Sequence, residues 1–339
     1  MVNNSDSERA FDRVLVTGSS GFIGCNFLRL MVPERPDTEW VNLDALTYAG
    51  RPENTEDFAD AENYRCVHGS IEDGMLVEAL FSENGGFDAV VNFAAESHVD
   101  RSIAGPRVFV ETNVLGTQNL LEAARRHGTE RFVQLSTDEV YGSLGPDDPP
   151  FTERSNLEPN SPYSASKASA DLLCRAYYET YGMNVMTTRC SNNYGPYQYP
   201  EKLIPTFIRK ALADEPVPLY GDGMNVRDWL HVEDHCRAVA MVMDDGTAGG
   251  VYNVGGSNEH ANLEITKLIL DHLGKSEDLI SYVTDRLGHD RRYAIDSSHI
   301  RNRLGWRPEH DFEAGIRETI DWYVDNVEWT QRVMAGAAG

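Results

Sequence analysis

Short apolar runs alternate with longer helical stretches along the first half of the chain. The apolar runs have the length and composition of buried strands, and they lie at residues 13–17, 40–44, 64–68, 89–94, 131–136 and 184–189. The stretches with helical length and composition lie at residues 22–31, 75–83, 113–127 and 162–181. This alternation predicts βαβ units, so we expect an α/β protein with a Rossmann-type, doubly wound parallel sheet.

The pattern changes near residue 196. Five prolines punctuate the chain between residues 196 and 218, and two glycines follow at Gly221 and Gly223. We therefore expect a larger dinucleotide-binding domain over residues 10–195, which later segments rejoin. A smaller C-terminal substrate-binding domain is expected mainly over residues 196–330. A chain of 339 residues is long enough for both.

The charge balance narrows the range of partners. The chain has 54 acidic and 30 basic residues, which gives a formal net charge of −24. This charge fits either an ordinary acidic cytosolic protein or a halophilic one, in which salt screens the self-repulsion. Both interpretations argue against a nucleic-acid partner, because phosphate binding needs a basic face.

The cysteines and the hydropathy bear on location. Five cysteines lie far apart, without metal-ligand spacing, as expected for reduced thiols in a cytoplasmic protein without a bound metal. No apolar run is long enough to span a membrane, so no membrane partner is expected. Residues 1–10 are polar and acidic, unlike a signal peptide, and we expect a short disordered arm there.

A glycine-rich turn directly follows the first predicted strand. Gly18, Gly21 and Gly24 surround Phe22 and Ile23 in the run V-T-G-S-S-G-F-I-G, where a helix is expected to begin. Glycines allow a tight turn and a close approach of the backbone to a pyrophosphate, and the helix N-terminus offers free amide donors. A tight turn alone would also need glycine, so the surrounding pattern has to support the assignment.

That support comes from an acidic residue at the end of the second strand. Asp44 lies 20 residues after Gly24, the spacing of the carboxylate that holds the adenosine ribose in dinucleotide-binding domains. Its charge would repel the extra phosphate of NADP, so we predict NAD as cofactor. Asp73 follows the third strand, and it is either near the adenine or simply a helix N-cap.

Tyr163 and Lys167 are one helical turn apart and therefore face the same way. The lysine charge would lower the pKa of the phenol, which would let Tyr163 act as a base near neutral pH. A surface Tyr beside a surface Lys is the plain alternative.

With these features the chain resembles the extended short-chain dehydrogenase/reductase family. Besides the glycine-rich loop and the Tyr-Lys pair, it has the family's N-V-x-G-T helix motif at residues 113–117. The resemblance implies that Tyr163 removes a hydroxyl proton while hydride passes to the nicotinamide. It also implies that Lys167 holds the nicotinamide ribose.

An acidic pair follows the strand at residues 131–136. Thr137 can hydrogen-bond a substrate hydroxyl, and Asp138 and Glu139 are adjacent carboxyl groups. Two carboxyl groups crowded in a cleft titrate apart, so that one serves as acid and the other as base. In such an acidic chain, a solvated turn is the alternative interpretation.

Four long strings bring the resemblance closer to the nucleotide-sugar 4,6-dehydratases that act on dTDP-glucose. These strings lie at residues 94–103, 135–144, 189–205 and 219–234. The resemblance implies that Tyr163 deprotonates the hydroxyl on sugar carbon 4, Glu139 removes the proton on carbon 5, and Asp138 protonates the hydroxyl leaving carbon 6. It also implies nucleotide-sugar contacts at Ser97, Asn192, Lys202, Arg227, Asn262, Arg292 and Tyr293.

Other outcomes remain open from the sequence. An NAD-dependent nucleotide-sugar 4-epimerase shares the oxidation step but usually lacks the acidic pair, and UDP- or CDP-glucose is an alternative substrate. A non-catalytic NAD-binding regulator fits poorly with the intact Tyr163. Ser70 stands where the family often has an Asp near the adenine. By analogy with the family, the helices at residues 113–127 and 162–181 would form a homodimer interface.

Overall fold

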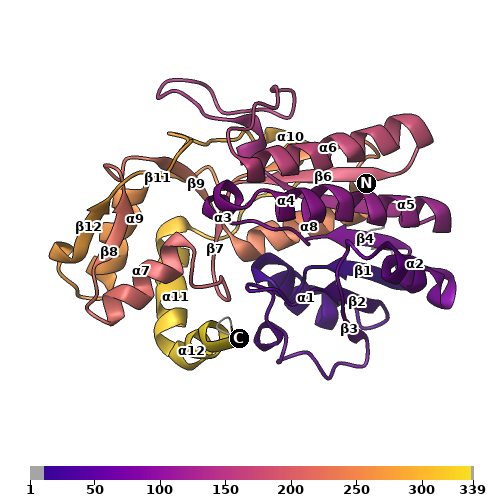
Figure 1. Ribbon diagram of the computed structural model, residues 1–339, viewed down its shortest axis with the longest axis horizontal. Coiled ribbons are helices and arrows are strands. Elements are labelled where there is room, and N and C mark those ends of the chain that lie inside the picture. Colours follow the sequence, from indigo (N-terminus) through magenta and orange to yellow (C-terminus); the bar gives the residue numbers. More distant parts are fainter. Residues whose placement is uncertain (1–10, 337–339) are drawn as a thin grey trace, which may run out of the picture.

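The computed structural model describes residues 11–336, and Figure 1 shows its two parts. The polar arm at residues 1–10 lies outside the described residues. The larger part is built on a seven-stranded sheet, and its strands in spatial order are β10 (Val251–Val254), β6 (Val185–Cys190), β5 (Arg131–Thr137), β4 (Ala89–Asn92), β1 (Arg13–Thr17), β2 (Glu39–Asp44) and β3 (Tyr64–His68). Every neighbouring pair is parallel, which confirms the predicted Rossmann-type fold class.

The sheet is buried on both faces because successive side chains of a strand point to opposite sides. Val14 and Val16 of β1 join one apolar core, and Leu15 between them joins the other. The first core is covered by the helices α1 (Phe22–Glu34), α8 (Val232–Asp245) and α10 (Ser298–Leu304). The second is covered by α2 (Gly74–Ser82), α5 (Thr117–His127) and α6 (Pro162–Tyr181).

The smaller part lies to the left in Figure 1 and has its own core. It contains a three-stranded sheet in the order β11 (Glu259–Ala261), β9 (Val226–His231) and β7 (Asn192–Tyr194), and a pair of parallel strands, β8 (Val217–Tyr220) and β12 (Ile280–Val283). Its helices are α7 (Leu203–Leu212), α9 (Asn262–His272), α11 (Phe312–Asp325) and α12 (Val327–Ala335). Although β10, α8 and α10 follow residue 195, they lie with the large sheet.

Two elements differ from the predicted bounds. The apolar run expected to be a strand over residues 89–94 pairs only over β4, because Phe93 and Ala94 leave the sheet to pass Gly18. The helix expected over residues 113–127 begins earlier, as α4 (Arg107–Val110), and includes a π-helical segment, η3 (Glu111–Gly116), before α5. Within this segment Asn113 accepts a hydrogen bond from the Glu96 amide and donates to Ser166. A π-helical turn is frequent near functional sites.

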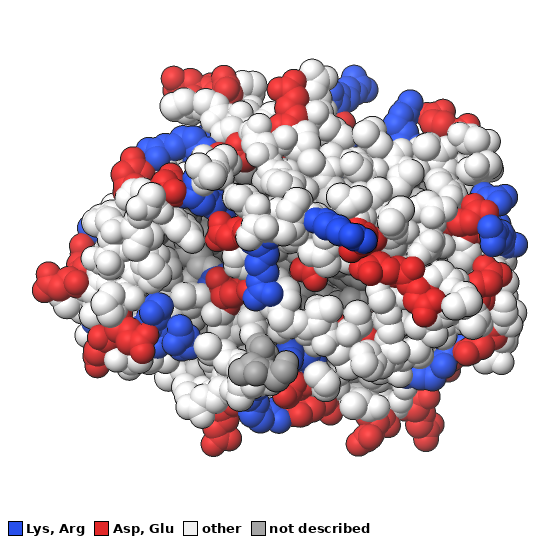
Figure 2. Space-filling view, in the orientation of Figure 1, with Lys and Arg blue, Asp and Glu red and all other residues white. Residues whose placement is uncertain are grey.

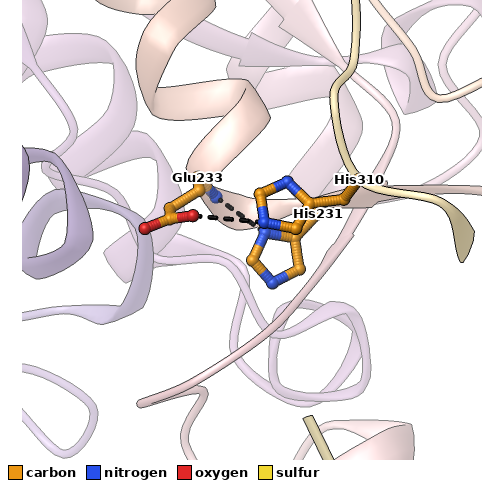
Figure 3. A group of neighbouring side chains, drawn as sticks. All are labelled: His231, Glu233 and His310. Carbon is orange, nitrogen blue, oxygen red and sulfur yellow. Dashed lines mark hydrogen bonds and ion pairs between the residues drawn. The ribbon is translucent and has the colours of Figure 1, made fainter. Parts of the chain in front are cut away.

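His310 links the smaller part of the molecule to α8 of the larger part, and its ring stacks on that of His231 (Figure 3). The rings of His231, at the end of β9, and His310, in the loop before α11, stack with centroids 3.8 Å apart and planes 22° apart. His310 also pairs with the carboxylates of Glu233 (3.2 Å) and Asp234 (3.1 Å). An imidazole binds a metal ion in its own plane, so two nearly parallel rings cannot share one ion as they stand. We therefore interpret the group as an ion-paired clamp.

The clamp predicts a dependence of stability on pH. Asp234 and Glu233 raise the pKa of His310 from 6.5 to about 9, so the folded protein holds this proton more tightly than the unfolded chain does. The stabilisation is complete below pH 6.5 and is lost as the pH rises through about 9. We expect the unfolding temperature to fall between roughly pH 7 and 10, and to fall less in His310→Gln.

The matched control is His272→Gln, which removes the contact of His272 with Asp321. This variant should keep the full wild-type fall. Circular dichroism measures the unfolding temperature. If this temperature falls equally with pH in wild type and in His310→Gln, the ion-paired clamp is contradicted.

Candidate active site

A cleft of about 570 Å³ opens at the carboxyl ends of the central strands, where α/β sheets bind their ligands. Its volume is typical of a small-molecule site. It is lined by most of the residues predicted for the site, namely Gly18, Gly21, Phe22, Ile23, Gly24, Asp44, Ser97, Thr137, Asp138, Glu139, Tyr163, Lys167, Asn192 and Lys202. Five predicted residues do not line it, namely Asp73, Arg227, Asn262, Arg292 and Tyr293.

The glycine-rich loop forms one wall of the cleft. Gly18 has φ +69°, and a Cβ there would lie 2.5 Å from the Ala94 backbone. A Cβ on Gly24 would lie 2.6 Å from the Cα of Ser19, so the helix could not start so close to the strand. Gly21 directly precedes α1 and has no side-chain cap, which leaves amide donors at the helix N-terminus. This arrangement fits a dinucleotide pyrophosphate.

Asp44 lies at the end of β2 and is almost completely buried. It accepts hydrogen bonds from the amides of Ser20 (2.7 Å) and Leu46 (2.8 Å), which tie the glycine-rich loop to the loop after β2. Burial raises the pKa of this carboxyl. Its position beside the loop suits contact with a ribose, as expected for NAD.

Asp73 caps a helix. Its carboxylate accepts hydrogen bonds from the amides of Met75 (3.0 Å) and Leu76 (3.1 Å) at the start of α2. The helix cap is one of the two interpretations left open by the sequence. Contact of Asp73 with the adenine stays a prediction. Ser70, by contrast, lines the cleft.

The Tyr163–Lys167 pair lies on the first turns of α6, with both side chains buried. The expected lowering of the phenol pKa is wrong for this structure. Burial raises the pKa of Tyr163 well above 10, the Glu139 carboxylate raises it further, and only Thr137 opposes them. The Lys167 Nζ instead donates to the Leu135 carbonyl oxygen at 2.6 Å. A positive charge brought close to the phenol would oppose this rise.

The acidic pair lies on η4 (Asp138–Tyr141), the short helix that directly follows β5. Asp138 is buried, one of its oxygens has no hydrogen-bond partner, and the other accepts from Thr137 Oγ1 at 3.3 Å. Burial, and then the charge of Glu139, raises the pKa of Asp138 well above its usual range. The pKa of Glu139 is raised less strongly, since Arg286, Arg227 and Lys202 oppose burial. Asp138 is thus suited to donate a proton and Glu139 to accept one.

Arg227 and Tyr293 do not line the cleft, but both interact electrostatically with Glu139 of the acidic pair. The buried Arg227 guanidinium lies 4.3 Å from the centroid of the Tyr293 ring, and it donates to the Asp290 carbonyl oxygen at 3.0 Å. Its charge lowers the pKa of both Asp138 and Glu139. The Asn262 side chain has a buried oxygen without a hydrogen-bond partner.

Arg292 is already engaged. Its guanidinium pairs with Glu259 at 2.6 Å and donates to the carbonyl oxygens of Gly145 and Asp148. A pyrophosphate contact at Arg292 would have to compete with these groups, and it stays a prediction.

Some residues of the site were not singled out from the sequence. Glu96 and Tyr48 line the cleft, and burial raises the pKa of each. Arg286 lowers the pKa of Glu139, and its effect is larger than that of Arg227 or Lys202. Glu96 belongs to the string at residues 94–103, which could have signalled it. Arg286 has no such signal, because a lone arginine in a loop of an acidic chain looks like a surface ion pair.

Comparison with known proteins identifies the family. Residues 15–319 match the family described as GDP-mannose 4,6 dehydratase. The chain belongs to this family. A dTDP-glucose 4,6-dehydratase of Xanthomonas campestris is 52% identical over 341 residues, which cover 95% of this chain and 96% of that protein. Another from Salmonella typhimurium is 47% identical over 349 residues and 96% of both chains.

Solved structures of family relatives have the same fold. DesIV of Streptomyces venezuelae, a dTDP-glucose 4,6-dehydratase with NAD and TYD bound, gives a TM-score of 0.91 at 51% identity and covers 95% of this chain and 99% of its own. UDP-glucose 4-epimerase of Thermus thermophilus, in complex with NAD, gives a TM-score of 0.85 at 31% identity. The match covers 93% of this chain and 99% of the epimerase chain. Since dehydratases and epimerases share the fold, the side chains in the cleft have to discriminate between them.

The cofactor assignment predicts different effects at two acidic residues. Asp44→Asn removes the charge in the cleft, so we expect the affinity for NAD to fall about tenfold or more and the preference over NADP to weaken. Asp73→Asn is the matched control, because Asn caps a helix as well as Asp does. Its affinity for NAD should stay unchanged in a fluorescence titration. An equal loss in both variants would instead support contact of Asp73 with the adenine.

Proposed function

We propose that this protein is an NAD-dependent lyase that dehydrates dTDP-glucose to dTDP-4-keto-6-deoxyglucose. One observation carries the proposal: the Asp138–Glu139 pair opens into the same cleft as Tyr163, Lys167 and the glycine-rich loop. Oxidation alone needs only the Tyr-Lys pair, whereas removal of water needs an acid and a base as well. The relatives that are about half identical over nearly the whole chain are named for this reaction.

The first step oxidises carbon 4 of the sugar. Gly18, Gly21, Gly24 and Asp44 would hold NAD, which when bound accepts hydride from carbon 4 and returns it to carbon 6, so that it is regenerated. Tyr163 takes the proton of the carbon 4 hydroxyl. The positive charges of Lys167 and of the oxidised nicotinamide favour the phenolate and offset the burial that keeps Tyr163 protonated.

The second step eliminates water. The carbonyl formed at carbon 4 acidifies the hydrogen on carbon 5, and Glu139 removes that proton. Asp138, held protonated by burial and by its neighbour, donates a proton to the hydroxyl that leaves carbon 6. A proton then returns to carbon 5 as carbon 6 is reduced, so the net change is the loss of one water.

The nucleotide part of the substrate needs cations and hydrogen-bond donors. We assign the pyrophosphate to Arg227 and Arg292, and the sugar and phosphates to Asn192 and Lys202. Ser97, Asn262 and Tyr293 supply further contacts. Support for Arg227 comes from its buried charge, which acts on Glu139, and from the fit of a guanidinium to bidentate binding of phosphate.

A nucleotide-sugar 4-epimerase is the second candidate, because an epimerase gives a close structural match. Against it stands the buried Asp138, whose raised pKa suits an acid that an epimerase does not need. A non-catalytic regulator would need neither Asp138 nor Tyr163.

We also propose a cytoplasmic homodimer that is adapted to high salt. Exposed apolar side chains gather on α4, η3 and α6, at Val108, Val110, Leu115 and Leu172, which favours pairing through these elements. The five free cysteines fit a reducing compartment. Within residues 11–336, no helix is long and apolar enough to cross a membrane.

The acidic side chains are spread over the visible face rather than gathered in one patch (Figure 2). With a net charge of −24, this distribution favours screening by salt.

Light scattering at high and low salt tests the homodimer, and thermal unfolding at the same salt concentrations tests the adaptation to high salt. A monomeric mass throughout, or an unfolding temperature that does not rise with salt, would contradict them.

Mass spectrometry of the reaction products tests the activity. With added NAD and high salt, we expect dTDP-glucose to lose one water, and UDP-glucose, CDP-glucose and GDP-mannose to remain unchanged. Asp138→Asn combined with Glu139→Gln should slow the loss of water about 100-fold or more, yet still convert NAD to NADH. Loss of water from another donor would correct the substrate. Inversion at carbon 4 without loss of water would support the epimerase.

A further inference from the structure

Three loops from distant parts of the sequence meet at the rim of the cleft. Residues 45–50 follow β2 and continue from Asp44, and residues 196–202 follow β7. Residues 93–98 follow β4 and lead into the short helix α3 (Val99–Ala104), which carries Arg101. All three contribute side chains to the lining of the cleft. Their mutual contacts therefore hold the rim together.

The contacts between the three loops converge on Arg101, Tyr48 and Glu201. The Arg101 guanidinium lies 3.6 Å from the centroid of the Tyr48 ring, and its NH2 lies 3.3 Å from Glu201 Oε2. The Tyr48 ring also meets the Tyr199 ring edge-on, with centroids 5.7 Å apart. Arg101 thus contacts the first loop through the Tyr48 ring and the third loop through the Glu201 carboxylate.

Two further contacts tie the second loop to the third. Lys202 Nζ donates to the Ser97 carbonyl oxygen at 3.1 Å, and His98 Nε2 lies 3.7 Å from Glu201 Oε2. The second oxygen of Glu201 is buried without a hydrogen-bond partner, while Glu201 and burial together raise the pKa of Tyr48. The phenol of Tyr48 therefore stays protonated beside this carboxylate, where it can donate to it.

The first loop is also connected to the cofactor wall. Asp44 accepts a hydrogen bond from the Leu46 amide, and a Cβ on Gly50 would lie 2.6 Å from Asp44 Oδ1. Displacement of Tyr48 must therefore disturb the segment that holds Asp44. Arg101 is exposed and Tyr48 and Tyr199 are only partly buried, so these cross-links belong to the part of the structure that opens at low cost.

We propose that Arg101, Tyr48, Glu201 and Tyr199 form a strap that closes the rim of the cleft and retains the dinucleotide between the two redox steps. The inference rests on the proposed function for its purpose. A dehydratase has to reduce the same sugar that it has oxidised, so escape of the reduced cofactor would leave the sugar at the oxidised stage. The strap joins the cofactor side of the rim to the substrate side, and it slows dissociation rather than taking part in the chemistry.

The test measures dissociation of the cofactor in the absence of sugar. The protein is loaded with NADH and mixed with excess NAD, and the loss of NADH fluorescence gives the dissociation rate. We expect this rate to rise about tenfold in Arg101→Gln and in Tyr48→Ala, with the association rate changed much less. Tyr48→Phe retains the ring that meets Arg101 and Tyr199, so its rate should rise by less than that of Tyr48→Ala.

Lys275→Gln is the matched control, since it also removes one positive charge but breaks only the pair with Asp214, outside the cleft. Its dissociation rate should equal that of wild type, and circular dichroism should show that all variants are folded. Rates within about twofold of wild type in both Arg101→Gln and Tyr48→Ala would overturn the strap.

This result does not depend on whether the protein dehydrates dTDP-glucose, so failure of the strap and failure of the proposed function can be told apart. If the protein is active, Arg101→Gln should also release more free NADH per molecule of product than Lys275→Gln does. Equal release from the two variants would argue against retention by the strap.

Discussion

The whole site depends on one close approach of two backbones, that of Gly18 and Ala94. β1 and β4 are neighbours in the sheet, and the chain leaving each strand turns over the same edge. Only a residue without a side chain, at positive φ, fits where Gly18 passes Ala94. This contact sets the glycine-rich loop, to which we assign the dinucleotide, directly beside the segment that leads to Glu96, Ser97 and Arg101. The cofactor and substrate sides of the cleft therefore share one fixed point.

Burial is the second organising factor, because it controls which groups of the cleft hold protons. It raises the pKa of Asp138 and Tyr163 strongly and that of Glu139 less strongly. The protein without cofactor is thus prepared for the acid step but not for deprotonation of Tyr163. Binding of a positively charged nicotinamide would shift that balance, so the cofactor supplies charge as well as redox capacity.

Much of the fold was predictable because the sheet is parallel and buried on both faces. Its strands appear as continuous apolar runs, and the glycines and Asp44 have fixed spacing in the sequence. The end of β4 was not predictable, since Phe93 and Ala94 are apolar and leave the sheet where they pass Gly18. The π-helical segment around Asn113 was also missed, because the contact that Asn113 makes there is with Glu96, 17 residues away, and leaves no local pattern.

The site residues also divide into those that the sequence could predict and those that it could not. Those at strand ends, such as Thr137 and Asp138, follow from local pattern and from the resemblance. Contacts made in three dimensions, such as Arg286 near Glu139 or Arg292 with Glu259, leave no local pattern. The pKa of Tyr163 depended on burial, which spacing to Lys167 alone could not reveal.

The central claim is that one cleft oxidises, dehydrates and re-reduces the same sugar with one cofactor. The most direct measurement follows dTDP-glucose that carries deuterium at carbon 4, mixed with unlabelled substrate. The account predicts that the label appears at carbon 6 of the product and stays within the molecule that carried it. Loss of the label to solvent, or its appearance in molecules that began unlabelled, would contradict the account.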